Sequence, residues 1–456
     1  MSAEKAHEIH EWIEGMEPSE MREVLQGLID SDSGVLELLR KERALRSGDV
    51  GYIKEQVESS FKPRRGFYAY HQANDYAQAA QEAVQLMERA SANPPLGLLK
   101  VVERAITLAT RVALRSDSSS GMQGYQLEQL LDLHADTFQR LASQGKLTAV
   151  ERRRVVDWLF RYRYGGKQDL FDPDIAAYAG ALSQRMIERY RKHLDSVPEA
   201  DRRYGGYAWV RLAVVDKDAD AIIALHGGED ANYLQVESML ADLEEAGLPL
   251  HCLRVAQKAR KRLGGSDPWH QEPKFLDRLE RYYLDAGRAE DAVALRLERH
   301  EQVATGSSFH KLRDLTEALG EWEEHRVHAE HLLQASRPDA YLAYLLEVDR
   351  DEDAWRFWET LEEPAVELGE KMLERRARTN PSDVLAGYEA LIEETLVPTQ
   401  KHAYYTAADL MKQLQRAALA AGEEERLNSF VARTLQQNRR RPTCIAIFER
   451  AGFPAK

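Results

Sequence analysis

Apolar residues recur at spacings of three and four along almost the whole chain. The clearest example begins with Leu98, Val101, Val102, Ala105 and Ile106. This spacing places apolar side chains on one face of an α-helix. The nearest approach to a strand, residues 209–215, is short and follows two glycines. The sequence therefore predicts an all-α fold, because no convincing run of alternating β-branched and aromatic residues accompanies the helical spacing.

Residues that favour helix ends agree with this periodicity. Asp32 and Ser33 precede a predicted helix over 35–45, and a pair of prolines precedes another over 96–114. Asp172 and Pro173 stand before a long predicted helix over 174–194. Proline is tolerated in the first helical turn, where its missing N–H would have no helical partner. Carboxylates at such a position interact favourably with the helix dipole, which accounts for the acidic residues near 172 without a metal site.

The second half of the sequence repeats a helix–turn–helix pattern. Predicted tight turns fall at residues 287, 320 and 349, which are 33 and 29 residues apart. Further copies are suggested by Gly247-Leu248-Pro249 and by the segment 380–383. A period near 34 residues is typical of tetratricopeptide-type helix pairs, which stack because each pair leaves an apolar face uncovered.

A polar stretch between two long predicted helices, residues 196–206, contains Pro198, Gly205 and Gly206. Such composition suits a boundary between domains. We therefore expect an N-terminal helical domain over 1–197 and a tetratricopeptide-like α-solenoid over 207–456. Solenoid surfaces commonly hold segments of other proteins, so the leading hypothesis is a non-catalytic scaffold or adaptor with a protein partner.

Composition narrows the class further. The 456 residues include 62 basic and 76 acidic residues, which gives a formal charge of −14. Two cysteines exclude a disulfide framework. The longest stretches without a charged residue, such as 175–184, are too short to span a bilayer. Because the first residues have no apolar signal-peptide core, a cytoplasmic protein is expected. The oligomeric state is left open by the sequence.

Basic residues nevertheless concentrate in two segments that could contact nucleic acid. The segment 254–262 has no acidic residue, and the last 56 residues contain ten basic and five acidic residues. Clustered cations neutralise phosphates, so nucleic-acid association, as in DNA repair or phage defence, is the alternative function. The candidate contacts are Arg254, Lys258, Lys261, Arg262, Arg439, Arg440 and Arg441. A third group comprises residues 152–154 with Arg161 and Arg163.

Large aromatic residues gather near the middle of the repeats. Tyr341, Tyr344, Trp355 and Trp358 lie on consecutive predicted helices. Such residues usually form the core between repeats, but exposed aromatics in a solenoid groove anchor partner segments. These four are therefore the candidate partner-binding residues.

Catalytic patterns are missing from the sequence. There is no Gly-x-Ser-x-Gly elbow and no phosphate-binding Gly-x-x-x-x-Gly-Lys motif. The one metal candidate is Glu321, His325 and His328, which share a helix face at i, i+4 and i+7. Their alternative interpretation is a solvated helix face. We expect no cofactor and no enzymatic activity, with a metal-dependent enzyme as a third and less favoured hypothesis.

Several short segments resemble an uncharacterised bacterial all-helical family that often follows a SWIM zinc finger. The resemblance implies a helical fold and no known catalytic residues. A SWIM finger needs four cysteine and histidine ligands, whereas this chain has only Cys252 and Cys444, 192 residues apart, so the finger itself is absent. The segments that carry the resemblance are 116–121, 131–135, 158–160, 169–171, 190–194, 245–249, 404–414, 439–441 and 450–453.

Overall fold

A computed structural model describes residues 3–199, 206–263, 272–361 and 366–454. Within these ranges the chain is helical, and its only β-type pairing is an isolated bridge between Tyr68 and Ser116. The predicted all-α fold is thus confirmed. The chain divides into two compact units, Met1–Arg262 and Leu263–Lys456, which are described separately below.

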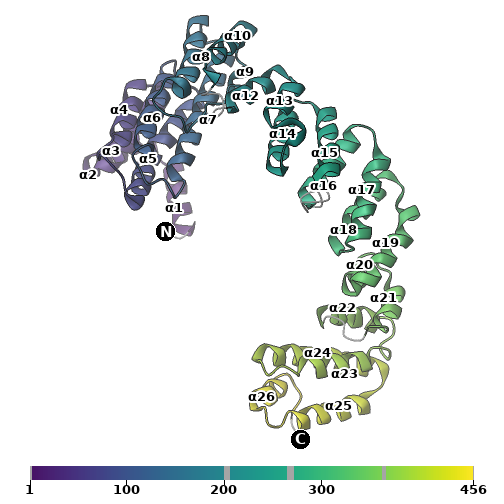
Figure 1. Ribbon diagram of the computed structural model, residues 1–456. Coiled ribbons are helices and arrows are strands. Elements are labelled where there is room, and N and C mark those ends of the chain that lie inside the picture. Colours follow the sequence, from purple (N-terminus) through teal and green to yellow (C-terminus); the bar gives the residue numbers. More distant parts are fainter. Residues whose placement is uncertain (1–2, 200–205, 264–271, 362–365, 455–456) are drawn as a thin grey trace. The chain divides into compact units, whose positions relative to one another are not determined.

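The first unit begins with helices that contribute little to its core and continues into a tightly packed bundle (Figure 1). Its helices are α1 (Ala3–Glu14), α2 (Pro18–Ser31), α3 (Ser33–Ser47), α4 (Val50–Phe61), α5 (Tyr70–Ser91), α6 (Leu98–Ala113), α7 (Met122–Ser143), α8 (Ala149–Tyr164), α9 (Ala176–Ala179), α10 (Gln184–Asp195), α12 (Tyr207–Asp216), α13 (Ala219–Leu225), the 3₁₀ turn η1 (Gly228–Asp230), α14 (Tyr233–Glu245) and α15 (Pro249–Leu263).

Local residue chemistry explains several of the helix ends. The Asp32 side chain caps α3 by accepting a hydrogen bond from the backbone N–H of Gly34 at 2.7 Å. At the start of α8, the Thr148 hydroxyl accepts from the Glu151 N–H, and the Glu151 carboxylate accepts from the Thr148 N–H. This reciprocal capping satisfies two backbone donors that a helix start leaves without helical partners.

Helices α4 to α7 form the hydrophobic centre of the first unit. Helix α4 packs on α5 and α6, and α7 packs on the same two helices. The apolar face predicted from Leu98 onward is buried here, with Val102, Ala105 and Ile106 fully covered. The period of three and four in α6 therefore reflects its packing on both sides.

The long helix predicted over 174–194 is divided in the structure. It is replaced by the four-residue helix α9 and by α10, with a break at residues 180–183. Asp174 does not lie inside a helix: its carboxylate accepts from the Ala176 N–H and binds Arg211 of α12. Tertiary ion pairing therefore accounts for this carboxylate, in addition to the helix dipole that the sequence suggested.

The second unit is a run of antiparallel helices in which each helix packs on its neighbours in sequence, as in an α-solenoid. Alternate helices also pack together, for example α17 on α19 and α20 on α22. The helices are α16 (Pro273–Asp285), α17 (Ala289–Gln302), α18 (Gly306–Leu319), α19 (Trp322–Ser336), α20 (Pro338–Glu347), α21 (Asp351–Trp358), α22 (Val366–Ala377), α23 (Leu385–Thr395), α24 (Lys401–Ala421), α25 (Glu424–Gln437) and α26 (Pro442–Arg450).

The predicted repeat turns are confirmed by their backbone conformation. Gly287, Gly320 and Asp349 each separate two paired helices, with φ of 69°, 77° and 56°. Gly247 adopts the same left-handed conformation between α14 and α15. This conformation ends one helix and lets the chain reverse into the next, and glycine adopts it without steric cost.

The predicted boundary at 196–206 lies within the first unit, and residues 200–205 fall outside the described ranges. The helix pairs α12–α13 and α14–α15 belong to the first unit, so repeat-like pairs occur in both units. None of the described helices is both long enough and apolar enough to cross a lipid bilayer.

Candidate functional site

The basic segment predicted from the sequence forms one wall of a groove in the first unit. Arg254, Lys258, Lys261 and Arg262 of α15 all line this space of about 700 Å³. We call it the α13–α15 groove. Its floor consists of four side chains that are almost fully buried from the other side, and they are apolar: Val236, Met239, Val255 and Ala259.

The opposite wall of the α13–α15 groove carries two acidic residues and one apolar residue, Asp220, Glu229 and Ile223. The Lys258 ammonium lies 3.2 Å from the Glu229 carboxylate, and Arg254 lies 3.8 Å from Asp220. All four side chains are more than half exposed, so these ion pairs contribute little to stability. A ligand can displace them at low cost.

Two further rim cations differ in their bonding. Arg262 donates a hydrogen bond to the backbone carbonyl of Ala231, which fixes its position at one end of the groove. Lys261 has no ion pair with any residue in the described ranges. The groove thus combines an apolar floor with a positively charged edge, a combination suited to an acidic, partly apolar ligand.

The predicted arginines at the C-terminal end lie in the second unit and are not gathered into one surface feature. Arg439 borders a separate pocket with Leu435 and Phe453. Arg440 is exposed, whereas Arg441 is half-buried and donates to the Leu396 carbonyl at 2.5 Å. The run of three arginines therefore includes one residue with a structural role.

The aromatic residues predicted to bind a partner belong mainly to the core of the second unit. Tyr341, Tyr344 and Trp355 are all less than 10% exposed, and Trp358 packs against the same core. The Trp355 and Trp358 rings are 5.2 Å apart. An anchor residue needs an exposed surface, so the burial of these rings favours the alternative interpretation of packing between repeats.

A buried carboxylate explains why two of these rings are tyrosines. Glu330 of α19 accepts hydrogen bonds from the Tyr344 hydroxyl at 3.1 Å and from Arg350 at 2.7 Å. The Tyr341 hydroxyl lies 3.4 Å from the other oxygen of the same carboxylate. Burial, followed by the nearby Glu330, raises the pKa of Tyr344 to about 12, so its hydroxyl stays protonated and acts as a donor.

The histidine-containing metal candidate is not brought together. His328 pairs instead with Glu301 of the preceding helix at 3.0 Å. Glu321 stands at the start of α19 and His325 is half-buried one turn later. Across the described part of the chain, no three His, Cys, Asp or Glu side chains are arranged to hold a metal ion.

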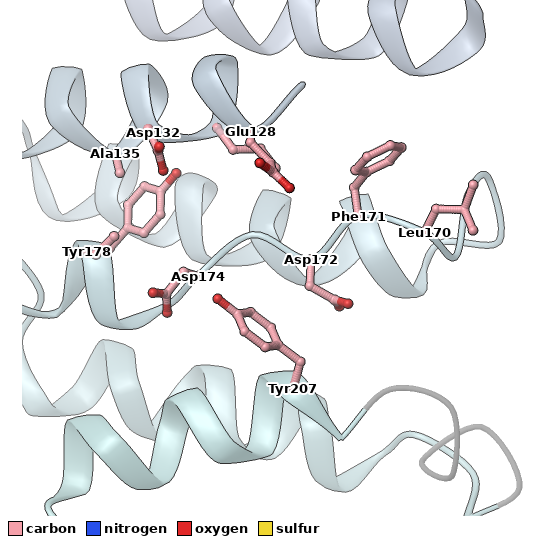
Figure 2. A pocket seen from close by; sticks show the side chains of 11 residues that line it. Glu128, Asp132, Ala135, Leu170, Phe171, Asp172, Asp174, Tyr178 and Tyr207 are labelled. Atoms are coloured by element: carbon pink, nitrogen blue, oxygen red, sulfur yellow. The ribbon is translucent and has the colours of Figure 1, made fainter. Parts of the chain in front are cut away.

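An acidic pocket of about 480 Å³ lies between α7, the segment before α9, and α12 (Figure 2). Four carboxylates border it: Glu128, Asp132, Asp172 and Asp174. Figure 2 shows the Tyr207 hydroxyl pointing towards Asp174 and the Tyr178 hydroxyl towards Asp132. Partial burial, followed by Asp136 and Glu128, raises the pKa of Asp132.

Two of these carboxylates already have cationic partners. Asp172 binds Arg163 at 2.7 Å, and Asp174 binds Arg211 through two hydrogen bonds of 2.8 and 2.9 Å. The remaining negative charge comes from Glu128 and Asp132. The pocket therefore favours a cationic group, but much of its charge is used to hold the first unit together. The sequence showed the acidic residues near 172 but not their approach to α7.

His134 links this region to α6 and is fully buried. Its Nδ1 lies 2.8 Å from the Tyr178 hydroxyl and its Nε2 lies 3.2 Å from Glu103. Burial lowers the pKa of His134, although the Glu103 carboxylate acts in the opposite direction. A neutral ring that accepts from Tyr178 and donates to Glu103 satisfies all of these groups.

This arrangement predicts a pH-dependent stability of the first unit. In the unfolded chain the histidine takes up a proton as the pH falls below about 6.5, whereas the folded protein resists protonation. The free energy of unfolding should therefore be highest above pH 6.5 and should fall between about pH 6.5 and 5.5. Thermal unfolding followed by circular dichroism across this range measures the effect.

The matched variant is His134→Gln, which keeps a polar side chain but does not titrate. It should be less stable than the wild type at neutral pH and should lose less stability on acidification over the same range. An equal pH dependence in both proteins would show that His134 is not the responsible group.

Comparison with known proteins adds little beyond the helical fold. No protein family model matches the chain, and no curated protein matches its sequence. Among solved structures, a designed-type "Circular tandem repeat protein with novel repeat topology and enhanced subunit contact surfaces" aligns with 95% of this chain and 93% of its own, at 16% identity and a TM-score of 0.22. Yeast Tom70 aligns with 94% of this chain and 96% of its own, at 10% identity and a TM-score of 0.18.

The class of protein therefore follows from the helices of this chain. It is an all-α protein built largely from packed antiparallel helix pairs. Its surface features are the α13–α15 groove and pockets on both units.

Proposed function

We propose that the protein is a non-catalytic scaffold that binds an acidic, amphipathic segment of a partner protein in the α13–α15 groove. The observation that carries this proposal is the combination of an apolar floor with four cationic side chains from one helix. Apolar side chains of the partner would cover Val236 and Met239. Its carboxylates would pair with Lys261 and replace Glu229 and Asp220 as partners of Lys258 and Arg254.

Grooves between packed helices commonly receive amphipathic helices, which present apolar residues at i, i+3, i+4 and i+7. The cationic edge selects acidic segments because like charges across an interface are unfavourable. The floor supplies affinity, since it removes apolar surface from water when the groove is occupied. This division of roles makes two separable predictions for variants.

The direct test uses a fluorescein-labelled acidic amphipathic peptide of about 18 residues, with leucines at the helical spacing above. Anisotropy should show binding to the wild-type chain. The double variant Arg254→Glu/Lys258→Glu should weaken binding about fivefold, because rim charges contribute modestly to affinity. Ile223→Asp should weaken it as well, since it places a charge against the apolar part of the ligand.

The matched control is Arg140→Glu/Arg185→Glu, which makes the same charge change at exposed positions of α7 and α10. It should bind the peptide like the wild type. A companion experiment compares proteins co-purified with the wild type and with the groove variants. The proposal fails if no stoichiometric partner is recovered, or if the groove variants retain both the partner and the peptide.

A further inference from the structure

A second cationic cleft, not apparent in the sequence, lies between α6 and α8 of the first unit. It encloses about 730 Å³. We call it the α6–α8 cleft. Six basic side chains line it, and Glu103 is its one carboxylate: Lys100, Arg104, Arg111, Arg115, Arg161 and Lys167.

Most of these cations are exposed and available to a ligand. Within the described residues, no ion pair is formed by Lys100, Arg111, Arg115 or Lys167, and all four are exposed. Arg104 has a surface pair with Glu58 at 3.4 Å, with both side chains more than 40% exposed. Such a pair exchanges readily for a ligand anion.

The single carboxylate of the cleft is already neutralised from behind. Glu103 accepts two hydrogen bonds from Arg154, at 2.7 and 2.8 Å, and lies 3.2 Å from His134. Burial acts to raise the pKa of Glu103, but the hydrogen bonds from His134 and Arg154 outweigh it, so the pKa is lowered. The ionised and paired Glu103 therefore does not cancel the charge of the six cations.

The cations are arranged as a row along α6. Lys100, Arg104 and Arg111 are separated by four and seven residues, so they lie on one face of the helix. From Lys100 to Arg111 the row extends about 16 Å along the helix axis. Arg115 follows just beyond the helix end, and Arg161 and Lys167 line the same cleft from α8 and the loop after it. A row of this length exceeds what a single phosphate group requires.

The floor of the cleft is partly aromatic and partly hydroxylic. Trp158 and Tyr162 of α8 are stacked with their ring centres 5.4 Å apart. The Tyr162 hydroxyl is hydrogen-bonded to the Thr110 hydroxyl at 2.8 Å, and Thr107 lies on the same side. These contacts fix the floor, because Trp158 is also held by His134 at a centroid distance of 4.5 Å.

From this geometry we infer that the α6–α8 cleft binds single-stranded nucleic acid. A single strand offers what the cleft matches: successive phosphates for the row of cations, and flat bases for the aromatic floor. An acidic peptide would satisfy the cations but not the rings. A lone phosphate or a mononucleotide would leave most of the row unoccupied. The site is distinct in residues from the α13–α15 groove and does not depend on the proposed scaffold function.

The test measures anisotropy of a labelled oligothymidine of about 15 nucleotides with the full chain. Binding should weaken as salt rises. If about four phosphates are neutralised, the logarithm of affinity should fall with the logarithm of salt at a slope of about −3. The double variant Lys100→Glu/Arg111→Glu should bind at least about tenfold more weakly and with a shallower slope.

The control variant is Arg254→Glu/Lys258→Glu, which reverses two charges in the α13–α15 groove. It should keep wild-type affinity for the oligonucleotide, and the cleft variant should keep wild-type affinity for the acidic peptide. This reciprocal design separates the two sites, so either can fail alone. Circular dichroism verifies that each variant is folded, and the single variant Lys167→Ala, at an exposed loop position, gives a second reading with minimal structural risk.

Four results would overturn the inference. One is the absence of binding at low salt, and another is an equal loss of affinity in the cleft and groove variants. The third is binding of a duplex of the same length as tightly as the single strand, because this would show a generic electrostatic surface. The fourth is displacement of the oligonucleotide by polyglutamate of equal charge at equal concentration, which would assign the cleft to acidic peptides.

Discussion

Replacement of Arg211 by alanine is expected to lower the free energy of unfolding of the first unit by about 3 kcal/mol. Arg211 is only 6% exposed. Its guanidinium binds Asp174 through two hydrogen bonds, Asp242 at 2.6 Å and Glu245 as well. Removing it leaves three carboxylates close together without their shared counter-ion. The loss should therefore exceed that of an ordinary surface ion pair.

The measurement is chemical or thermal unfolding of the full chain, and the midpoint of the first transition should fall by roughly 10 °C. Arg211→Lys should give an intermediate loss, because lysine keeps the charge but cannot bind a carboxylate through two parallel hydrogen bonds. The matched control is Arg89→Ala, which removes an exposed pair with Glu42 in the same unit. It should cost less than about 1 kcal/mol. Equal losses in Arg211→Ala and Arg89→Ala would contradict this account of Arg211.

In the second unit, Gly387→Ala is expected to destabilise the protein by about 2 kcal/mol, although alanine favours helix more than glycine does. A Cβ at position 387 would lie 2.5 Å from Leu373 Cδ2 and 2.6 Å from Trp358 Cη2. Leu373 is fully buried, so neither side chain can move aside freely. The overpacking penalty therefore outweighs the gain of about 1 kcal/mol from helix propensity.

Gly369→Ala provides the matched control on the neighbouring helix α22. A Cβ there would meet Leu391 at 3.5 Å and Trp358 at 3.7 Å, which are ordinary contacts. This variant should be as stable as the wild type or more stable by up to about 1 kcal/mol. Urea unfolding of both variants measures the difference. If the two substitutions shift stability in the same direction, close packing at Gly387 is not the deciding factor.

The fold was largely predictable because its determinants are local. Helical periodicity identifies α6 without tertiary information, and the turn residues Gly287, Gly320 and Asp349 mark the paired helices. The error at 174–194 has a tertiary cause. Asp174 is held by Arg211, which is 37 residues away, and no local pattern indicates that contact.

The candidate sites were less predictable for the same reason. The basic run 254–262 stands out in the sequence because its cations are adjacent. Lys100, Arg104 and Arg111 are separated by apolar residues and alternate with the buried face of α6, so they attract no notice. Their spacing on one helix face was a usable signal. The approach of Arg161 and Lys167 was not, since it depends on how α8 packs.

Aromatic residues illustrate the opposite difficulty. Tyr341 and Tyr344 have the composition expected of a binding surface, but a buried carboxylate, Glu330, accounts for their hydroxyl groups. Neither sequence composition nor spacing reveals that partner. Distinguishing an anchor from a core residue required knowing which helix faces the ring.

The Arg211 cluster has a consequence for how the first unit opens. One guanidinium joins the segment before α9, helix α12 and helix α14, which are successive parts of the chain. In an ordinary helical array each pair can fray on its own, because it contacts only its neighbours. Here the three segments share a single buried cation and should exchange their amide protons with solvent together, as one cooperative unit rather than in a graded series.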